Sequence, residues 1–280
     1  KRFPEAMGAH DRALDLAPGS DTHRHAFAQT LLMAGDPDQA MREAERTETI
    51  NPHNQLTHAL KGLVWRLKGD AREEWLNDYE RFVRPVDLPP PEGFRSMEEF
   101  NAALEQELIA LHRDRKRPID QTLRGGTQTL GNIFEQDHPL VRRLVPRIEE
   151  AIAAYVAGLP EEMRHPLSRG KDKKRRFSGS WSSRLAACGF HTNHVHPMGW
   201  ISACYYVALP QAVADTDKRQ GWIKFGETDF DVGLGGMVRR AVQPASGRVA
   251  IFPSYMWHGT IPFDTAETRT TIAFDIVPRD

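Results

Sequence analysis

Three histidines have the types and spacing of a metal site. His194 and His196 stand one residue apart in NHVHP, and His258 follows in SYMWHGT. Side chains at positions i and i+2 of a strand point to the same face, so the first two can bind one ion and a third from a later strand can complete the site. Arg269 follows His258 after eleven residues, and a guanidinium suits bidentate binding of a carboxylate beside the metal. This combination predicts an iron-dependent oxygenase.

Both features have a plainer alternative. A single histidine on a strand is more often a satisfied polar group than a ligand, and the pair with its distant third member is what favours a metal. His191 is a competing ligand, but it breaks the i, i+2 register. Arg269 heads the apolar segment TTIAFDI, where an unpaired charge is costly. A salt bridge at the sheet edge is the alternative to binding a carboxylate.

The elements that must position these residues are expected to be strands. From Trp181 onward, short segments rich in β-branched and aromatic residues are bounded by Gly or Pro. These segments are residues 201–209, 222–227, 248–253 and 269–277. Strands at this spacing, with no helices between them, indicate an antiparallel sandwich or barrel. Residues 122–134 also contain strand-like residues, interrupted by glycines.

The first 83 residues carry an internal repeat. Equivalent residues recur at an offset of 34, namely Ala6 and Ala40, Pro18 and Pro52, and Gly35 and Gly69. This is the period of tetratricopeptide repeats. We therefore expect residues 1–83 to be tetratricopeptide-like helical repeats, truncated at the N-terminus. Two roles stay open for them: a cap docked on the next domain, or a groove for a protein or peptide partner.

A proline-rich segment separates this region from the rest. Pro89 to Pro91 favour a stiff, extended chain, so residues 84–95 are expected to be a linker at a domain boundary. Residues 96–112 and 139–159 have the apolar spacing of amphipathic helices. The basic run at residues 170–177 is typical of a solvated loop, and contact with an acidic ligand is its alternative.

Composition narrows the class of protein. The chain has 280 residues, 40% of them hydrophobic, and a formal net charge of −1. This argues against a dedicated nucleic-acid or membrane partner, and no apolar run approaches the roughly 18 residues that span a bilayer. Cys188 and Cys204 form no disulfide framework, so a cytoplasmic location is expected. The chain starts at Lys1 rather than at a methionine, and we expect N-terminal sequence to be missing.

Together these motifs resemble a known family. Residues 181–278 are similar to the double-stranded β-helix of the 2-oxoglutarate- and Fe(II)-dependent oxygenases, most closely the prolyl-hydroxylase-like branch. The resemblance rests on His194-Val195-His196, the strand CYYVALP, the stretch GRVAIFPSYMWH ending at His258, and Arg269. It implies an α+β chain, with N-terminal tetratricopeptide helices followed by a C-terminal jelly-roll with flanking helices. The oxygenase domain would then span residues 96–280.

The resemblance also implies roles for individual residues. His194 matches the first iron ligand and His258 the distal one, while Arg269 matches the residue that binds the C5 carboxylate of 2-oxoglutarate. Tyr206 matches a hydrogen-bond donor to that carboxylate. Fe(II) and 2-oxoglutarate are the implied cofactor and cosubstrate, and no catalytic residue beyond the metal ligands is expected.

Four further residues are expected around this site. Cys204 and Thr271 share strand faces with the cosubstrate residues and are expected to line the pocket. Arg184 and Asn193 flank the histidine motif and are candidates for substrate binding. Trp181 and Trp200 also flank it, and we interpret both as barrel core.

His196 departs from the family pattern, which has Asp or Glu at this position. The departure allows a different metal, a different oxidation, or a carboxylate from elsewhere, for which Asp229 and Asp231 are candidates. The leading prediction is a hydroxylase that acts on a protein or peptide side chain. The alternatives are a small-molecule hydroxylase with structural repeats, a catalytically degenerate tetratricopeptide interaction protein, and a three-histidine dioxygenase that works without 2-oxoglutarate.

Overall fold

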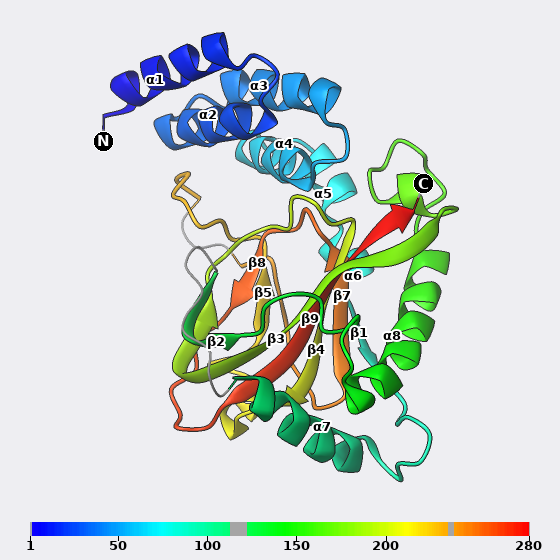
Figure 1. Cartoon of the computed structure of the whole chain (residues 1–280). Helices are drawn as coiled ribbons and strands as arrows, with labels where there is room; N and C mark the ends of the chain where they lie inside the picture. The colour runs from blue at the N-terminus through cyan, green and yellow to red at the C-terminus, as the bar shows by residue number, and fades with distance from the viewer. Residues whose placement is uncertain (1, 113–121, 235–237, 280) are drawn as a thin grey trace.

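Helices form the N-terminal part of the protein and antiparallel sheets form the rest. The computed structural model describes residues 2–112, 122–234 and 238–279. In Figure 1 the N-terminal helices form a layer across one end of the β structure. They are α1 (Phe3–Leu16), α2 (Asp21–Ala34), α3 (Pro37–Ile50), α4 (Gln55–Leu67), α5 (Arg72–Leu76) and α6 (Tyr79–Phe82). The predicted order of helical region and β region is therefore confirmed.

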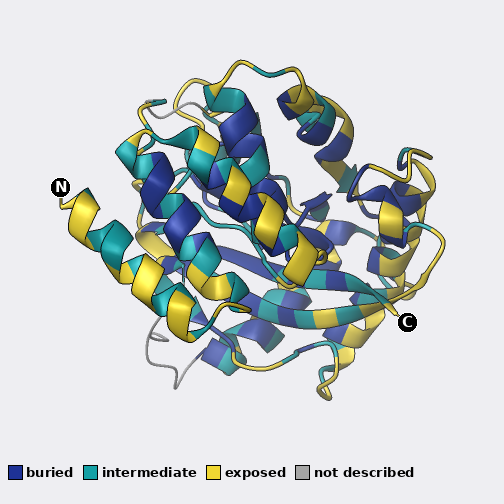
Figure 2. Ribbon diagram, turned by 90° about the horizontal axis from the view of Figure 1, so that it is seen from above, coloured by how far each residue is buried: buried dark blue, intermediate teal, exposed yellow. Residues whose placement is uncertain are grey.

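Local sequence signals set the ends of these helices. The side chains of Ser20, Asp36 and Asn54 cap α2, α3 and α4 by accepting a hydrogen bond from a backbone N–H of the first turn. Gly35 ends α2 with φ of 85°, a left-handed conformation that glycine adopts without strain. Figure 2 shows buried stripes along the helices, although α1 at the N-terminus buries no residue.

The helical layer is joined to the β structure through shared cores. Leu31, Leu60 and Leu63 form a small core of α2 and α4, against which Phe230 and Val232 of a β-region loop pack. Other residues of α4 and the short helices, including Ala59, Trp65, Leu76 and Phe82, belong to the main core of the protein. The helices from α4 onward are therefore not an independent unit.

Nine strands of the described chain form two antiparallel sheets. The larger sheet has the order β1-β7-β4-β9-β3-β2 and the smaller has the order β6-β5-β8. Their bounds are β1 (Arg84–Asp87), β2 (Leu123–Gln128), β3 (Lys174–His191), β4 (Ile201–Ala208), β5 (Ile223–Phe225), β6 (Arg240–Val242), β7 (Arg248–Pro253), β8 (His258–Thr260) and β9 (Arg269–Arg279). The strands predicted from Trp181 onward are thus present, though several are shorter than expected.

Two expected loops instead contribute strands. The expected linker opens with β1, which pairs with β7 through Val86 and Val249. Pro85 is tolerated there because β1 is an edge strand, where a missing N–H breaks no ladder. The basic run also differs from expectation, because Lys174 to Arg176 begin β3 and pair with the end of β9.

Two longer helices flank the larger sheet. They are α7 (Met97–His112) and α8 (Pro139–Ala157), close to their predicted ranges. The Glu99 amide donates to Ser96 Oγ at 3.2 Å, so Ser96 caps the N-terminus of α7. The Tyr205 hydroxyl of β4 donates to Asn101 Oδ1 of α7 at 2.6 Å. Two 3₁₀ turns, Ser168–Gly170 and Gln211–Ala214, complete the order. None of the described helices has the length and apolarity to cross a membrane.

Candidate metal centre and its cavity

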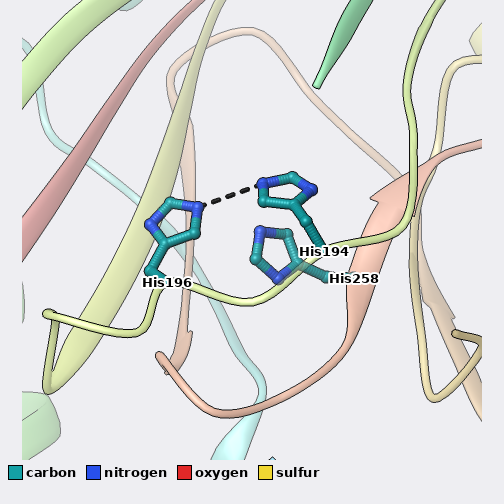
Figure 3. Close-up of side chains that lie close together, drawn as sticks. All are labelled: His194, His196 and His258. Atoms are coloured by element: carbon teal, nitrogen blue, oxygen red, sulfur yellow. Dashed lines mark hydrogen bonds between the residues drawn. The ribbon is translucent and has the colours of Figure 1, made fainter. Parts of the chain in front are cut away.

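The imidazoles of His194, His196 and His258 converge on one point (Figure 3). One ring nitrogen from each lies within 4.8 Å of the others. The ring centroids are 4.3 Å apart for His194 and His258, and 5.0 Å apart for His196 and His258. His258 is buried and the other two are half-buried. The structure therefore brings together the three histidines that the sequence singled out.

Backbone pairing produces this convergence. His194 and His258 form an isolated antiparallel bridge, in which each amide donates to the other's carbonyl at 2.9 and 3.0 Å. The His196 amide donates to the Ser254 carbonyl at 3.0 Å. The histidine pair therefore lies on an extended loop held against the chain before β8. We expected the i, i+2 alternation of a regular strand to direct both side chains to one face. The bridge also directs them to one point.

Each of the three rings has a fixed hydrogen-bond acceptor at its Nδ1 atom. The acceptors are the Thr192 carbonyl for His194 at 2.7 Å, the Met256 carbonyl for His258 at 2.9 Å, and Asp275 Oδ1 for His196 at 2.6 Å. None of these oxygens carries a proton when Asp275 is ionised, so each Nδ1 must donate. In the neutral imidazole the remaining nitrogen, Nε2, then presents a lone pair.

The opposed lone pairs fit a cation. Nε2 of His194 and Nε2 of His196 are only 3.1 Å apart, the contact drawn as a dashed line in Figure 3. Burial lowers the pKa of His194 to about 3 and holds the pKa of His258 well below its usual value, with the neighbouring histidines as a second cause. Neutral rings that face each other with lone pairs repel, and a shared metal ion removes that repulsion.

A buried guanidinium lies in the same cavity. Arg269 at the start of β9 is only 1% exposed, and its Nε donates to the Gly221 carbonyl at 3.1 Å. Its guanidinium carbon lies 5.1 Å from the centroid of the Tyr206 ring. Within the described residues no carboxylate forms a salt bridge with Arg269, so the sheet-edge salt bridge is not found. A buried positive charge of this kind favours an anionic ligand.

The cavity that holds these groups measures about 460 Å³, within the range of small-molecule sites. One face of β9 lines it through alternate residues, namely Arg269, Thr271, Ala273 and Asp275. Cys204 of β4 lines it as well. The placement of Cys204 and Thr271 in the pocket wall therefore agrees with the expectation from sequence.

Two residues beside Arg269 shape its surroundings. Tyr206 is fully buried and lies next to the guanidinium, but its hydroxyl has no hydrogen-bond partner in the described part of the chain. His191 lines the cavity, with Nδ1 3.3 Å from Thr260 Oγ1. Burial, and next the charge of Arg269, hold the pKa of His191 well below its usual value. His191 is not in the histidine cluster, as its register suggested.

Tyr206 and four other predicted residues lie outside the cavity wall. Arg184 is on β3, where its neighbour Ser183 lines the cavity instead. Asn193 donates to Glu227 Oε2 at 3.1 Å and to the Thr228 carbonyl at 3.0 Å. Asp229 and Asp231, the candidate substitute carboxylates, line a separate hollow beside α4.

The sequence reasoning missed two residues that the fold places at the histidines. Asp275 is one. The alternation of side chains along the strand could have revealed it, because it stands on the same face of β9 as Arg269 and Thr271. Trp181 is the other. It lines the cavity, with its ring centroid 5.7 Å from that of His196. The core interpretation is wrong for Trp181 but correct for Trp200, which is 4% exposed.

Known proteins resemble this chain in sequence or in fold. Residues 179–275 match the model of a family described as "Putative 2OG-Fe(II) oxygenase". A solved prolyl-4-hydroxylase of Pseudomonas putida has a TM-score of 0.50 and 15% identity, with 73% of this chain and 96% of that chain covered. A search of curated protein sequences finds no match.

Two further solved structures are similar at lower scores. A prolyl hydroxylase of Trichoplax adhaerens, solved with a hypoxia inducible factor peptide, has a TM-score of 0.46 and 10% identity over 76% of this chain and 93% of that one. HygX of Streptomyces hygroscopicus, solved with nickel, 2-oxoglutarate and hygromycin B, has a TM-score of 0.46 and 14% identity over 73% and 86%. By its family match over residues 179–275, the chain is similar to the 2-oxoglutarate- and Fe(II)-dependent oxygenases, a family that needs both Fe(II) and 2-oxoglutarate.

Proposed function

We propose that this protein is a non-haem Fe(II)- and 2-oxoglutarate-dependent hydroxylase of a protein or peptide side chain. One observation carries the proposal: a single cavity contains three converging histidine lone pairs and a buried arginine that has no acidic partner among the described residues. A divalent cation satisfies the first group and a carboxylate satisfies the second. Any other function for the cavity would have to explain both a cation-binding group and an anion-binding group in the same space.

The proposed roles follow from the contacts. His194, His196 and His258 hold Fe(II), each oriented by the acceptor at its Nδ1 atom. Arg269 holds the C5 carboxylate of 2-oxoglutarate, and the unpartnered hydroxyl of Tyr206 donates a further hydrogen bond to it. When bound, Fe(II) and 2-oxoglutarate supply the oxidising chemistry that activates O₂.

The other cavity residues control space and solvent. Ala273 is the small member of the lining face of β9, and it leaves room between Arg269 and the histidines. Ile223 and Phe252 give the cavity apolar walls that limit access of water. A low-polarity wall strengthens the ionic contacts of a bound dianion. Thr271 and Cys204 complete the wall on the arginine side.

The position of the helical layer supports a protein or peptide substrate. Pro197 and Met198 line the cavity directly after the histidine pair, and Met198 is 76% exposed. The Pro197 carbonyl accepts a hydrogen bond from the Gln55 amide at the start of α4. A chain bound at this cavity mouth would therefore run next to the N-terminal helices. The prolyl-4-hydroxylase fold of the Pseudomonas putida structure agrees with such a substrate.

We also propose that the N-terminal helices are tetratricopeptide repeats and that the sheets form a double-stranded β-helix. The helix caps Ser20 and Asn54 stand 34 residues apart, as do Gly35 and Gly69, which both have positive φ at the ends of α2 and α4. This equivalence at the turns supports the repeat. The second copy departs after α4, because α5 has only five residues where α3 has 14.

Turnover of 2-oxoglutarate tests the proposed function. Purified protein supplied with Fe(II) and O₂ should convert 2-oxoglutarate to succinate, and His258→Ala should abolish this conversion. His23→Ala, at an exposed histidine of α2, is the matched control and should retain it. Absence of both 2-oxoglutarate binding and succinate release in the wild type would reject the proposal, and full activity in His258→Ala would reject the metal site.

A further inference from the structure

Asp275 is the carboxylate nearest to the three histidines in the described structure, and it contacts only one of them. Its Oδ1 atom accepts a hydrogen bond from His196 Nδ1 at 2.6 Å and another from Ser202 Oγ at 2.6 Å. Ser202 Oγ in turn lies 2.8 Å from Ser254 Oγ. The Asp275 side chain is 16% exposed and that of His196 is 13% exposed. The contact is therefore short, largely shielded from water, and fixed from two sides.

The sheet builds this contact. Asp275 stands directly opposite Ser202 in the pairing of β4 with β9, so the serine holds the carboxylate where the His196 ring arrives from its loop. Gly199 keeps that loop close, because any side chain at this position would collide with Ser254. The carboxylate cannot readily turn away from the ring without losing both hydrogen bonds.

His196 differs from the other two histidines in the charge of its acceptor. His194 and His258 donate to backbone carbonyls, which are neutral. His196 donates to a carboxylate. All three acceptors orient a ring and increase its basicity, but the carboxylate does so most strongly and alone brings negative charge to the site. This difference falls on the histidine that replaces the acidic residue of the family pattern.

We infer that Asp275 is a positioning residue that supplies, through His196, the negative charge that a carboxylate ligand would supply directly. The inference rests on the proposed role of His196 as a metal ligand. Asp275 does not contact the metal itself: it fixes the tautomer of His196 so that Nε2 faces the other two rings, and it partly balances the dication from one residue away.

Metal affinity tests this inference without relying on turnover. Co(II), titrated into the metal-free protein without O₂ or 2-oxoglutarate, reports the dissociation constant through its visible absorption. Asp275→Asn retains an acceptor oxygen but removes the charge, and it should weaken Co(II) binding roughly 10- to 100-fold. Asp231→Asn is the matched control, because Asp231 is exposed and lies outside the cavity wall. It should bind Co(II) like the wild type.

A reciprocal exchange separates charge from structure. In His196→Asp/Asp275→Asn the negative charge moves from position 275 to position 196, and this variant should bind Co(II) more tightly than Asp275→Asn. Thermal unfolding of the metal-free variants shows whether a loss of affinity reflects a damaged fold. If Asp275→Asn binds Co(II) as tightly as the wild type, the inference is wrong while the proposed function stands. If the wild type binds no metal, the proposed function itself fails.

If Asp275→Asn does not fold, an NMR measurement on the wild type still tests the inference. In Zn(II)-loaded protein, the Nδ1 proton of His196 should resonate further downfield than those of His194 and His258, because its hydrogen bond is charge-assisted. Equal shifts for the three protons would contradict a charged acceptor at His196.

Discussion

The backbone amide of Gln55 donates a hydrogen bond of 2.8 Å to the carbonyl of Pro197. Gln55 begins the helix α4, and Pro197 directly follows His196. The helical layer is thus bonded to the loop that carries two of the three converging histidines. A second contact joins the helical layer to the β region: Phe230 of the β5–β6 connection packs against the core of α2 and α4.

This contact predicts that N-terminal deletions have graded effects. Deletion of residues 2–18 removes α1, which buries no residue, and should lower the melting temperature only slightly. Deletion of residues 1–83 removes Trp65, Leu76 and Phe82 from the main core, so the remaining protein should not fold. Each buried large side chain of this kind contributes about 2–5 kcal/mol. Circular dichroism melts of the two truncated proteins check this.

These deletions also separate the two classes of substrate. If the helices only stabilise the fold, the α1 deletion should leave turnover of the substrate unchanged. If they form a peptide groove, the same deletion should raise KM for a peptide and leave uncoupled succinate release intact. A folded, active fragment lacking residues 1–83 would contradict the shared core.

The burial of Arg269 predicts a strong effect on the cosubstrate. Arg269→Ala should weaken 2-oxoglutarate binding at least roughly 30-fold, because loss of one partner of a buried charge pair costs about 2–5 kcal/mol. Co(II) binding without 2-oxoglutarate should remain. Isothermal titration of the Co(II)-loaded protein measures the change, with Arg142→Ala on the exposed side of α8 as the control. Unchanged affinity would favour the alternative of a dioxygenase that works without 2-oxoglutarate.

The substitution Tyr206→Phe should weaken 2-oxoglutarate binding without destabilising the ligand-free protein. Its hydroxyl is buried without a hydrogen-bond partner in the described residues, so Tyr206→Phe should leave the ligand-free protein as stable as the wild type or more stable. The same change should weaken 2-oxoglutarate about fivefold, through loss of one hydrogen bond of about 1 kcal/mol. Melting curves without and with 2-oxoglutarate measure the stability of the ligand-free protein and its stabilisation by the cosubstrate. Destabilisation of the ligand-free protein would show that the hydroxyl already has a partner.

The buried His58 of α4 predicts a pH-dependent stability. Burial lowers its pKa from 6.5 to about 4, with smaller effects from Glu48, Lys61 and Arg169. The unfolded chain therefore binds more protons than the folded chain between these values, and stability is lost as pH falls from about 6.5 toward 4. The loss attributable to His58 is at most about 3 kcal/mol.

Urea unfolding at a series of pH values measures this slope. His58→Gln keeps a neutral polar side chain and should flatten the slope, whereas His23→Gln, at an exposed histidine of the same layer, should not. An unchanged slope in His58→Gln would assign the acid sensitivity to other groups, among them His25, whose pKa is also lowered by burial.

Local patterns in the sequence predicted most elements, and also the histidines and the arginine side of the cavity. The 34-residue offset located the turns at Gly35 and Gly69, and strand alternation placed Arg269 and Thr271 on one face. Asp275 lies on that same face, but its role depends on His196, which is 79 residues away. Only the register of β4 with β9 brings these two together, and single-sequence patterns do not specify register.

The same limit explains the misplaced acidic candidates. Asp229 and Asp231 are nearer to His196 in sequence than Asp275 is, yet they line a hollow beside α4. Their loop turns toward the helical layer because Phe230 and Val232 pack there. The contact between the two regions was not visible in either region alone, so sequence proximity favoured the wrong carboxylates.

The alternation along β9 has a consequence for how this gene can vary. Arg269 and Asp275 line the cavity from the same face of one strand, and that strand is paired on both sides, with β3 and with β4. Loss or gain of one codon between them would turn one of the two side chains to the opposite face. Neighbouring strands on both sides leave no room for a compensating slip. The number of residues between Arg269, which binds the anion, and Asp275, which supports the histidine, is therefore fixed.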